Sequence, residues 1–517
     1  MKKVAIGVVA VAVLAAGSTV AALRLLAGPS NEAASLAPPQ SALYTNLSLD
    51  PPLEQKLALR RLLTKFPEGE VPEDLATSLL DGAVEDLGLS FRDDVEPWLG
   101  DEIAFFFADV GNARAGTPPA VALLVATEDP AATEAAVEKS LRRTEGASAE
   151  PASYRGVRYD RLDDAAVGIV EGFLVVGTEQ GLRAAVDATQ GESLADSEEF
   201  AEATDSLREN RLAISYTNRL AEGLAALGDP GSEAFLEVGP AGGLGSGTGA
   251  GVLFARGDGL VFESTGEVPE EEPAASITKA AAEPGLLPEL PAGSWAALTM
   301  PQLGETIRDT LDLIPEEAGG PESVEQGLAM VGLDLEEDFL RWMGDLGGFG
   351  IGAAPEEVGG GLVITSSDRE ASIRAVERIG LLLKEEGVAA DLDEPGVPAG
   401  FTIPIPDLPQ DLVVAADEAD GNVSITFGRR ARQAIGGETL AGTEAFAAAE
   451  EGLGADFSSS FYADLSGILE LVDAIPEIQN DPDYRDVRPF LAPFSYAIAG
   501  TKVEGDTVIT RFVIGVS

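Results

Sequence analysis

The stretch GLSFRDDVEPWLGD, residues 88–101, occurs a second time in this chain of 517 residues as GLDLEEDFLRWMGD, residues 332–345. The two copies align without a gap, and they place two of the chain's three tryptophans at equivalent positions. Such a match between distant parts of one chain indicates a duplicated unit. The identical pairs are Gly88/Gly332, Leu89/Leu333, Asp94/Asp338, Trp98/Trp342, Gly100/Gly344 and Asp101/Asp345.

Other segments repeat in the same order around this stretch. Their period of about 250 residues is far longer than the 20–50 residues of solenoids and propellers, so it indicates two domains and not an array. We predict two tandem homologous domains, residues 41–266 and 291–517, with polar linkers at 27–40 and 267–290. The further matches are Pro38-x-x-Ser41 with Pro291-x-x-Ser294, Leu194-Ala195-x-x-Glu198-x-Phe200 with Leu440-Ala441-x-x-Glu444-x-Phe446, and Tyr216 with Tyr462.

Within one copy, the sequence predicts both strands and helices. Residues 121–126 form an apolar, strand-like run, and Asp129-Pro130 is typical of a helix start, with an N-cap followed by a first-turn proline. Short turns separate the next strands, which favours antiparallel pairing. We therefore predict an α+β fold, a mainly antiparallel sheet with helices packed on one face. The further elements expected are strands at 157–162, 165–170 and 172–177 and a helix at 178–189.

A resemblance to a known family rests on the layout of the chain behind its N-terminal apolar run and on three short segments. The two-copy layout, with SALY at 41–44, a helix ending in KFP at 65–67 and the WLGD segment at 98–101, resembles an exported bacterial family of the actinobacterial type. That family is catalogued as domain of unknown function 3352. The resemblance covers most of the body of the chain, but it implies no activity, substrate or catalytic residue.

The N-terminus predicts a membrane anchor. Lys2 and Lys3 precede an uncharged run, residues 4–23, which as a helix reaches about 30 Å, the thickness of the hydrocarbon core of a bilayer. The basic start should remain cytoplasmic. We therefore expect residues 1–26 to form a single transmembrane helix, with the body outside the cytoplasm. A cleaved secretory signal is the alternative, and it would leave the body secreted.

Charge and composition exclude several classes of function. The chain has 88 acidic and 34 basic side chains, a formal net charge of −54 and a pI near 4.1. This balance argues against DNA or RNA as partners, because phosphate neutralisation needs clustered Lys and Arg. The chain has no cysteine and no histidine, which excludes disulfides, thiolate nucleophiles, histidine-based triads and zinc sites built from these residues. We expect no cofactor and no metal.

The most distinctive local candidates are the two Trp-x-Gly-Asp segments. One interpretation makes Asp101 and Asp345 paired acids, with the tryptophans stacking on a sugar or lipid. The interpretation we favour is structural: the tryptophan packs on the sheet, the glycine ends a helix in the left-handed conformation, and the aspartate stabilises the following turn. The motif comprises Trp98, Gly100, Asp101, Trp342, Gly344 and Asp345.

One group of basic residues is unusual in so acidic a chain. The helix predicted at 53–66 has apolar residues at a spacing that leaves one face for packing. Its basic residues follow soon after the anchor and could contact anionic headgroups. A solvated outer face of a core-packed helix is the simpler account. These residues are Lys56, Arg60, Arg61 and Lys65.

Short motifs that suggest chemistry lack the residues that should accompany them. Ser276-x-x-Lys279 matches the nucleophile motif of penicillin-recognising enzymes, but the chain has no S-D-N or K-T-G. Asp417, Asp420 and Asn422 resemble a calcium loop, without its alternating spacing or its closing glutamate. No residue is assigned to catalysis.

We therefore expect a non-enzymatic, membrane-anchored binding or scaffold module of the cell envelope, whose partner is an envelope protein or a hydrophobic ligand. The alternative is a carrier or sensor of a lipid or other hydrophobic molecule, which would need a large apolar pocket. A weaker alternative is a carboxylate-based hydrolase, which needs two close carboxylates. With 88 acidic residues, the sequence cannot select such a pair.

Overall fold

The computed structural model describes residues 31–67, 84, 89–108, 119–143, 149–163, 165–205, 207–219, 247–269, 274–312, 320–405 and 410–517. The chain divides into two compact units, Met1–Glu267 and Val268–Ser517, called unit 1 and unit 2. The expected membrane span at 4–23 lies outside the described residues. Across the described ranges, every helix is too short or too polar to cross a bilayer.

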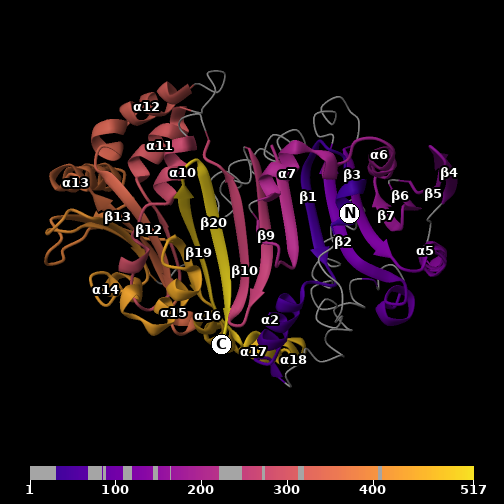
Figure 1. Ribbon diagram of the computed structural model, residues 1–517. Coiled ribbons are helices and arrows are strands. Elements are labelled where there is room, and N and C mark those ends of the chain that lie inside the picture. Colours follow the sequence, from indigo (N-terminus) through magenta and orange to yellow (C-terminus); the bar gives the residue numbers. More distant parts are fainter. Residues whose placement is uncertain are drawn as a thin grey trace. The chain divides into compact units, whose positions relative to one another are not determined.

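Unit 1 is built on one antiparallel sheet with the spatial order β10-β9-β8-β1-β2-β3-β7-β6-β5-β4 (Figure 1). Its register places Tyr44 opposite Phe106 on one side and Tyr216 on the other. The predicted α+β class with a mainly antiparallel sheet is confirmed. The strands are β1 (Ser41–Ser48), β2 (Leu99–Ala108), β3 (Ala120–Thr127), β4 (Glu150–Tyr154), β5 (Val157–Arg161), β6 (Ala166–Val170), β7 (Phe173–Gly177), β8 (Ala213–Asn218), β9 (Thr248–Arg256) and β10 (Gly259–Glu267).

Helices cover both faces of this sheet. On the face that carries Tyr44, the ring of Phe200 from α7 packs edge-on at 5.9 Å between ring centroids. On the opposite face, Ala136 of α5 packs in the cluster that contains Leu47. The expectation of helices on one face only is wrong, because β3 is a nearly continuous run of buried residues and needs cover on both sides. The helices are η1 (Glu32–Leu36), α2 (Leu53–Leu63), η3 (Phe91–Val95), α5 (Pro130–Arg143), α6 (Glu179–Gln190), η4 (Leu194–Asp196) and α7 (Glu198–Asp205).

Unit 2 repeats this arrangement strand for strand, in the order β20-β19-β18-β11-β12-β13-β17-β16-β15-β14. Each neighbouring pair is antiparallel, and each strand takes the place of one strand of unit 1. The strands are β11 (Ser294–Met300), β12 (Met343–Ile351), β13 (Gly359–Ser366), β14 (Ala390–Asp391), β15 (Ala399–Ile403), β16 (Leu412–Ala416), β17 (Val423–Phe427), β18 (Ser458–Asp464), β19 (Phe494–Glu504) and β20 (Thr507–Val516).

The helices of unit 2 also lie on both faces of its sheet. Phe446 of α15 packs on Tyr462 at 5.2 Å between ring centroids, and Val376 of α13 packs with Ile364 in the cluster on the other face. The helices are α10 (Ala274–Ala281), η5 (Leu287–Glu289), α11 (Leu303–Asp312), α12 (Gly320–Met330), η7 (Glu336–Leu340), η8 (Pro355–Glu357), α13 (Arg369–Glu385), α14 (Arg429–Ala434), η9 (Leu440–Gly442), α15 (Glu444–Leu453), α16 (Leu465–Asp473), α17 (Pro476–Gln479) and α18 (Pro482–Leu491).

Parts of both expected linkers are packed into the units. Ala33 and Leu36 of η1 are at most 1% exposed, and Leu287 of η5 is fully buried. Both segments pack beside the first strand of their unit, and local composition does not encode such a tertiary contact. The residue directly after each short helix accepts an equivalent backbone hydrogen bond. The Leu194 N–H donates to the Ala37 carbonyl after η1, and the Leu440 N–H donates to the Leu290 carbonyl after η5, both at 2.8 Å.

Candidate functional site

The duplicated segment has the same structure in both units. A short π-helix, η3 or η7, leads to the tryptophan, and the strand begins at the next residue. The indole Nε1 of Trp98 donates to the Asp94 carbonyl at 2.5 Å, and that of Trp342 donates to the Asp338 carbonyl at 2.9 Å. The tryptophans are only 5% and 2% exposed, so they serve the core and cannot stack on a ligand.

The glycines of the motif have a different role from the one expected. Strands β2 and β12 begin one residue before Gly100 and Gly344, so both glycines lie inside strands and neither has a left-handed φ. A Cβ at Gly100 would lie 2.7 Å from the Cβ of Ala126, and a Cβ at Gly344 would lie 2.5 Å from Thr365 Oγ1. The register with the neighbouring strand also shifts here in both units. These glycines allow the close approach of two strands at a bulge.

Substitutions at Gly100 should separate the two explanations. A left-handed helix end tolerates Asn better than Ala, whereas a close strand approach penalises the larger side chain more. We expect Gly100→Ala to lower the free energy of unfolding by about 1–3 kcal/mol and Gly100→Asn to lower it further. Chemical denaturation of the full chain measures both effects. The control is Gly156, which has φ +92° and no atom within 4 Å of an added Cβ, so there Asn should be the milder change.

Each aspartate of the motif is hydrogen-bonded to the segment that follows the first strand of its unit and not, as expected from the sequence, to the turn beside it. The carbonyl of Asp101 accepts the Leu49 N–H at 2.7 Å, and Asp345 Oδ1 accepts the Gln302 N–H at 3.0 Å. The two carboxylates belong to different units and neither faces a described pocket. Their surroundings therefore give no support to a catalytic acid pair.

A second duplicated feature was missed from the sequence. Asp94 and Asp338 each accept a hydrogen bond from the backbone N–H four residues earlier, at 2.9 and 2.8 Å. Each also forms an ion pair with a base on the helix that follows the third strand, Lys139 on α5 and Arg378 on α13. Both bases stand ten residues after the aspartate that precedes their helix. This regular spacing is the signal that could have revealed the pairs.

Removing Lys139 should weaken unit 1 only where Asp94 is ionised. The Lys139 ammonium, together with the Ser90 N–H, holds the pKa of the Asp94 carboxyl below its ordinary value of 3.8. A lowered carboxyl pKa contributes stability above the ordinary value, and this contribution is lost as pH falls through the folded-state pKa. We expect Lys139→Met to lower the free energy of unfolding by about 1 kcal/mol at neutral pH.

The difference in free energy of unfolding between Lys139→Met and the natural protein should shrink as the pH falls below 3.8. It should vanish below the folded-state pKa of Asp94. Denaturation curves of the full chain across this pH range provide the measurement. The exposed Lys279 on α10 provides the matched control, Lys279→Met, which should show no such pH dependence. A difference that does not change with pH would rule out the ion pair as its source.

The basic helix α2 is only partly available to solvent. Lys56 is 6% exposed and forms a buried ion pair with Asp50, so it cannot contact a membrane surface and its assignment there is wrong. Apolar spacing made Lys56 look like an outer-face residue, but the side chain reaches back to Asp50 in the segment before the helix. Arg60 and Arg61 are exposed, and Lys65 is half-buried.

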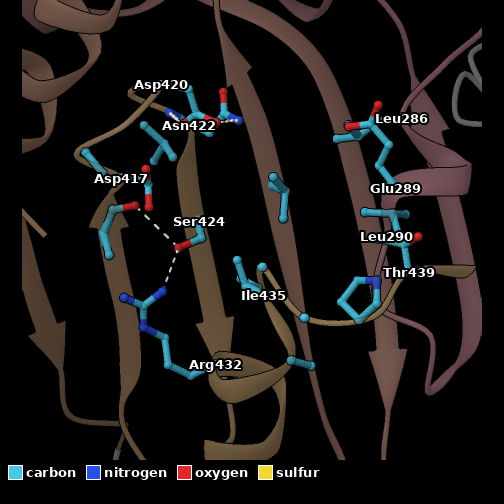
Figure 2. A pocket seen from close by; sticks show the side chains of 18 of the residues that line it. Leu286, Glu289, Leu290, Asp417, Asp420, Asn422, Ser424, Arg432, Ile435 and Thr439 are labelled. Atoms are coloured by element: carbon cyan, nitrogen blue, oxygen red, sulfur yellow. Dashed lines mark hydrogen bonds between the residues drawn. The ribbon is translucent and has the colours of Figure 1, made fainter. Parts of the chain in front are cut away.

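Unit 2 contains a pocket of about 280 Å³ lined in part by η5 and by the β16–β17 hairpin (Figure 2). The Arg432 guanidinium donates to Ser424 Oγ at 3.3 Å and to Glu394 at 3.0 Å. Asp417 and Asp420 accept backbone N–H groups of their own turn, which is the segment that resembles a calcium loop. These charged groups are already engaged, and among the described residues no group of three metal-ligating side chains is placed to hold an ion.

A second hollow in unit 2, of about 440 Å³, has almost entirely apolar walls, and we call it the groove. It lies on the sheet face that carries α13, beyond the part which that helix covers. Ile364 packs with α13, whereas Leu362, two residues earlier on the same face, is 41% exposed. The residues that line the groove include Leu298, Gly348, Leu362, Leu412, Ile425 and Phe461.

A row of residues across five strands forms the centre of the groove. From β18 to β17, the register pairs Phe461 with Leu298, Leu298 with Gly348, Gly348 with Leu362, and Leu362 with Ile425. Leu298 is 47% exposed. A Cβ at Gly348 would lie 3.4 Å from Leu298 Cδ1 and 3.3 Å from Leu362 Cδ2. The missing side chain therefore leaves a depression between two exposed leucines.

Two glycines that line the groove of unit 2, Gly348 and Gly350, are replaced by phenylalanines at the equivalent positions of unit 1. Phe105 occupies the register position of Gly348, and Phe107 that of Gly350. Phe107 is buried against Ala42 in unit 1. Sequence reasoning missed the groove because runs such as GGFG and GGGL are typical of turns, and only the strand register places their glycines side by side.

Comparison with known proteins identifies a family but no activity. A family model described as "Protein of unknown function (DUF3352)" matches residues 3–479, which confirms the resemblance to domain of unknown function 3352. No curated protein sequence matches the chain. A solved structure described as "Structure of crystal form I of TP0453" is similar over 46% of this chain and 79% of that chain, with 10% identity and a TM-score of 0.25. A likeness of this size carries no argument about this chain.

Proposed function

Since the chain belongs to the family described as protein of unknown function (DUF3352), whose description carries no activity, we propose a function from the geometry of the chain itself. It is a membrane-anchored binding module outside the cytoplasm, and the groove of unit 2 binds a ligand with an apolar body. The ligand class is a lipid or another hydrophobic molecule of the envelope. The proposal includes no catalytic step.

The groove carries this proposal. Its volume of about 440 Å³ falls within the range of small-molecule sites. Leu298 and Leu362 are almost half exposed and adjoin one another across Gly348, and contiguous apolar patches on soluble units commonly mark binding sites. Covering the exposed part of each leucine contributes roughly 1 kcal/mol. The nearly complete lack of polar lining favours an uncharged, chain-like ligand segment such as an acyl chain.

Membrane attachment is supported by the N-terminal sequence. The run at 4–23 is long enough for one span, and Lys2 and Lys3 before it favour a cytoplasmic N-terminus. An anchored binding module would have its ligand supplied from the adjacent bilayer. This location suits a ligand of low solubility in water.

We also infer that the two units descend from one duplicated domain and have since diverged in function. The shared strand order and the shared tryptophan and aspartate contacts support this origin. So does the start of each first strand, where Ser41 Oγ donates to Pro38 O and Ser294 Oγ donates to Pro291 O, both at 2.7 Å. Phenylalanines occupy the groove positions in unit 1, so ligand binding is assigned to unit 2 alone.

Photolabelling tests the proposed function. Membranes that carry the full chain are mixed with a long-chain fatty acid bearing a diazirine, irradiated and digested, and the labelled peptides are mapped. Label is expected on β11, β12 and β13, and the double variant Leu298→Gln/Leu362→Gln should lose it. The matched control, Leu381→Gln, changes a leucine that is 54% exposed on α13 and away from the groove lining. Label confined to residues 4–23 would contradict the assignment to the groove.

A further inference from the structure

The outer face of α2 in unit 1 combines exposed leucines with exposed arginines. Leu53 and Leu57, one turn apart, are 62% and 46% exposed. Arg60 and Arg61 follow on the next turn and are also exposed. A helix face with leucines beside arginines is typical of helices that lie in the interface of a bilayer.

Two acidic residues at the start of α2 make polar contacts within unit 1. Asp50 pairs with the buried Lys56, and the Glu54 carboxylate accepts a hydrogen bond from Asn210. The chain as a whole has a net charge of −54, so a face with two exposed arginines departs from its generally acidic character. An anionic surface should repel most of the molecule and attract this face.

The chain enters unit 1 at the same end of the sheet. Asn31 Oδ1 accepts hydrogen bonds from the Tyr44 hydroxyl at 2.7 Å and from the Asn46 amide at 3.0 Å. The Glu32 N–H donates to the Glu102 carboxylate at 3.0 Å. Tyr44 lies at the middle of β1 and Asn46 in its second half, Glu102 is opposite Ser48 at the end of that strand, and α2 begins shortly after it. The first described residues are therefore fixed near the α2 end of β1.

The connection from the membrane to this point is short. Only residues 24–30 separate the apolar run from Asn31, and fully extended they reach at most roughly 28 Å. A compact unit of this length measures on the order of 45 Å across. Because the tether is shorter than the unit is wide, the end of the sheet that carries Asn31 and α2 is held close to the bilayer.

We propose that the outer face of α2 docks on an anionic lipid surface. Leu53 and Leu57 enter the boundary between headgroups and acyl chains, and Arg60 and Arg61 bind the headgroup phosphates. The inference rests on the membrane anchor of the proposed function. Docking fixes the orientation of unit 1 on the membrane, with Lys56 excluded from the contact because it is buried with Asp50.

A chain without cysteine allows one unique probe position. Full-length Leu57→Cys is labelled with NBD and reconstituted into vesicles of phosphatidylglycerol and phosphatidylcholine that contain a doxyl-labelled lipid as quencher. We expect loss of NBD fluorescence at position 57. The matched control is Ala195→Cys on η4, an exposed site whose neighbour Leu194 bonds to Ala37, before the start of β1 and toward the other end of that strand. The probe there should keep its fluorescence.

Two further conditions make the test specific to lipid charge. Replacing Arg60 and Arg61 by Gln, or using phosphatidylcholine alone, should restore fluorescence at position 57, and added salt should act in the same direction. Equal quenching at both positions, no quenching at either, or quenching that ignores lipid charge overturns the docking. Vesicle flotation reports the anchor separately: a chain that floats but is unquenched at position 57 overturns the docking alone, and a chain that does not float overturns the anchor and the docking that rests on it.

Discussion

Filling the groove from its floor with Gly348→Leu is expected to weaken ligand capture about tenfold while unit 2 stays folded. The new side chain would lie between Leu298 and Leu362, whose flexible ends are 3.4 and 3.3 Å from the position of the added Cβ. Gly348 does not have a left-handed φ, so a larger residue suits its backbone, and loss of glycine's flexibility offsets some crowding by roughly 0.5–1 kcal/mol. Fatty-acid photolabelling of β11 and β13 should fall by on the order of tenfold, equivalent to about 1.4 kcal/mol of binding.

The matched control for this experiment is Gly327→Leu on α12. It adds the same side chain at a glycine that has no atom within 4 Å of an added Cβ and that does not line the groove. Labelling in this control should equal that of the natural protein. If Gly348→Leu labels normally while its unfolding midpoint is unchanged, the ligand binds elsewhere.

Asn46→Leu should have the largest effect on the stability of unit 1, because it removes a hydrogen bond from a buried carboxylate. Glu102 is 1% exposed, and the Asn46 amide donates to it. Burial raises the pKa of Tyr44, so its hydroxyl stays protonated and donates to Asn31 in the same cluster. Leaving the carboxylate short of a donor at low dielectric should lower the free energy of unfolding by about 3 kcal/mol.

The double variant Asn46→Leu/Glu102→Leu tests this cause. Replacing both polar partners by apolar groups of similar size should recover most of the lost stability. Chemical denaturation of the full chain measures both variants, and limited proteolysis should show faster cleavage within 31–37 in the single variant. Equal destabilisation of the single and double variants would mean that packing, and not the buried charge, is responsible.

The confirmed parts of the fold were those encoded by local pattern. The helix expected from Asp129-Pro130 begins at Pro130, where Asp129 Oδ1 accepts the N–H groups of Ala131 and Ala132 at 3.1 Å. The strands expected at 157–162, 165–170 and 172–177 lie within one residue of those observed. Turn residues and apolar runs act over a few neighbours, so one sequence is sufficient to place them.

The candidate site was not predictable in the same way. Lys56 looked like a surface base until the segment before α2 brought Asp50 to it. Gly100 looked like a helix end, although the neighbouring strand is what excludes a side chain there. The groove depends on Leu298, Gly348 and Leu362, which are far apart in sequence and meet only through strand register.

The repeated segments, the α+β class, the family and the chemistries that a chain without histidine or cysteine lacks could all be read from the sequence alone. Only the tertiary structure decided which faces are covered, which charges are buried and where an apolar surface remains open. The two kinds of property differ in the distance along the sequence over which they are set. Periodicity and capping are properties of adjacent residues, whereas burial depends on which distant strand or helix packs against a residue.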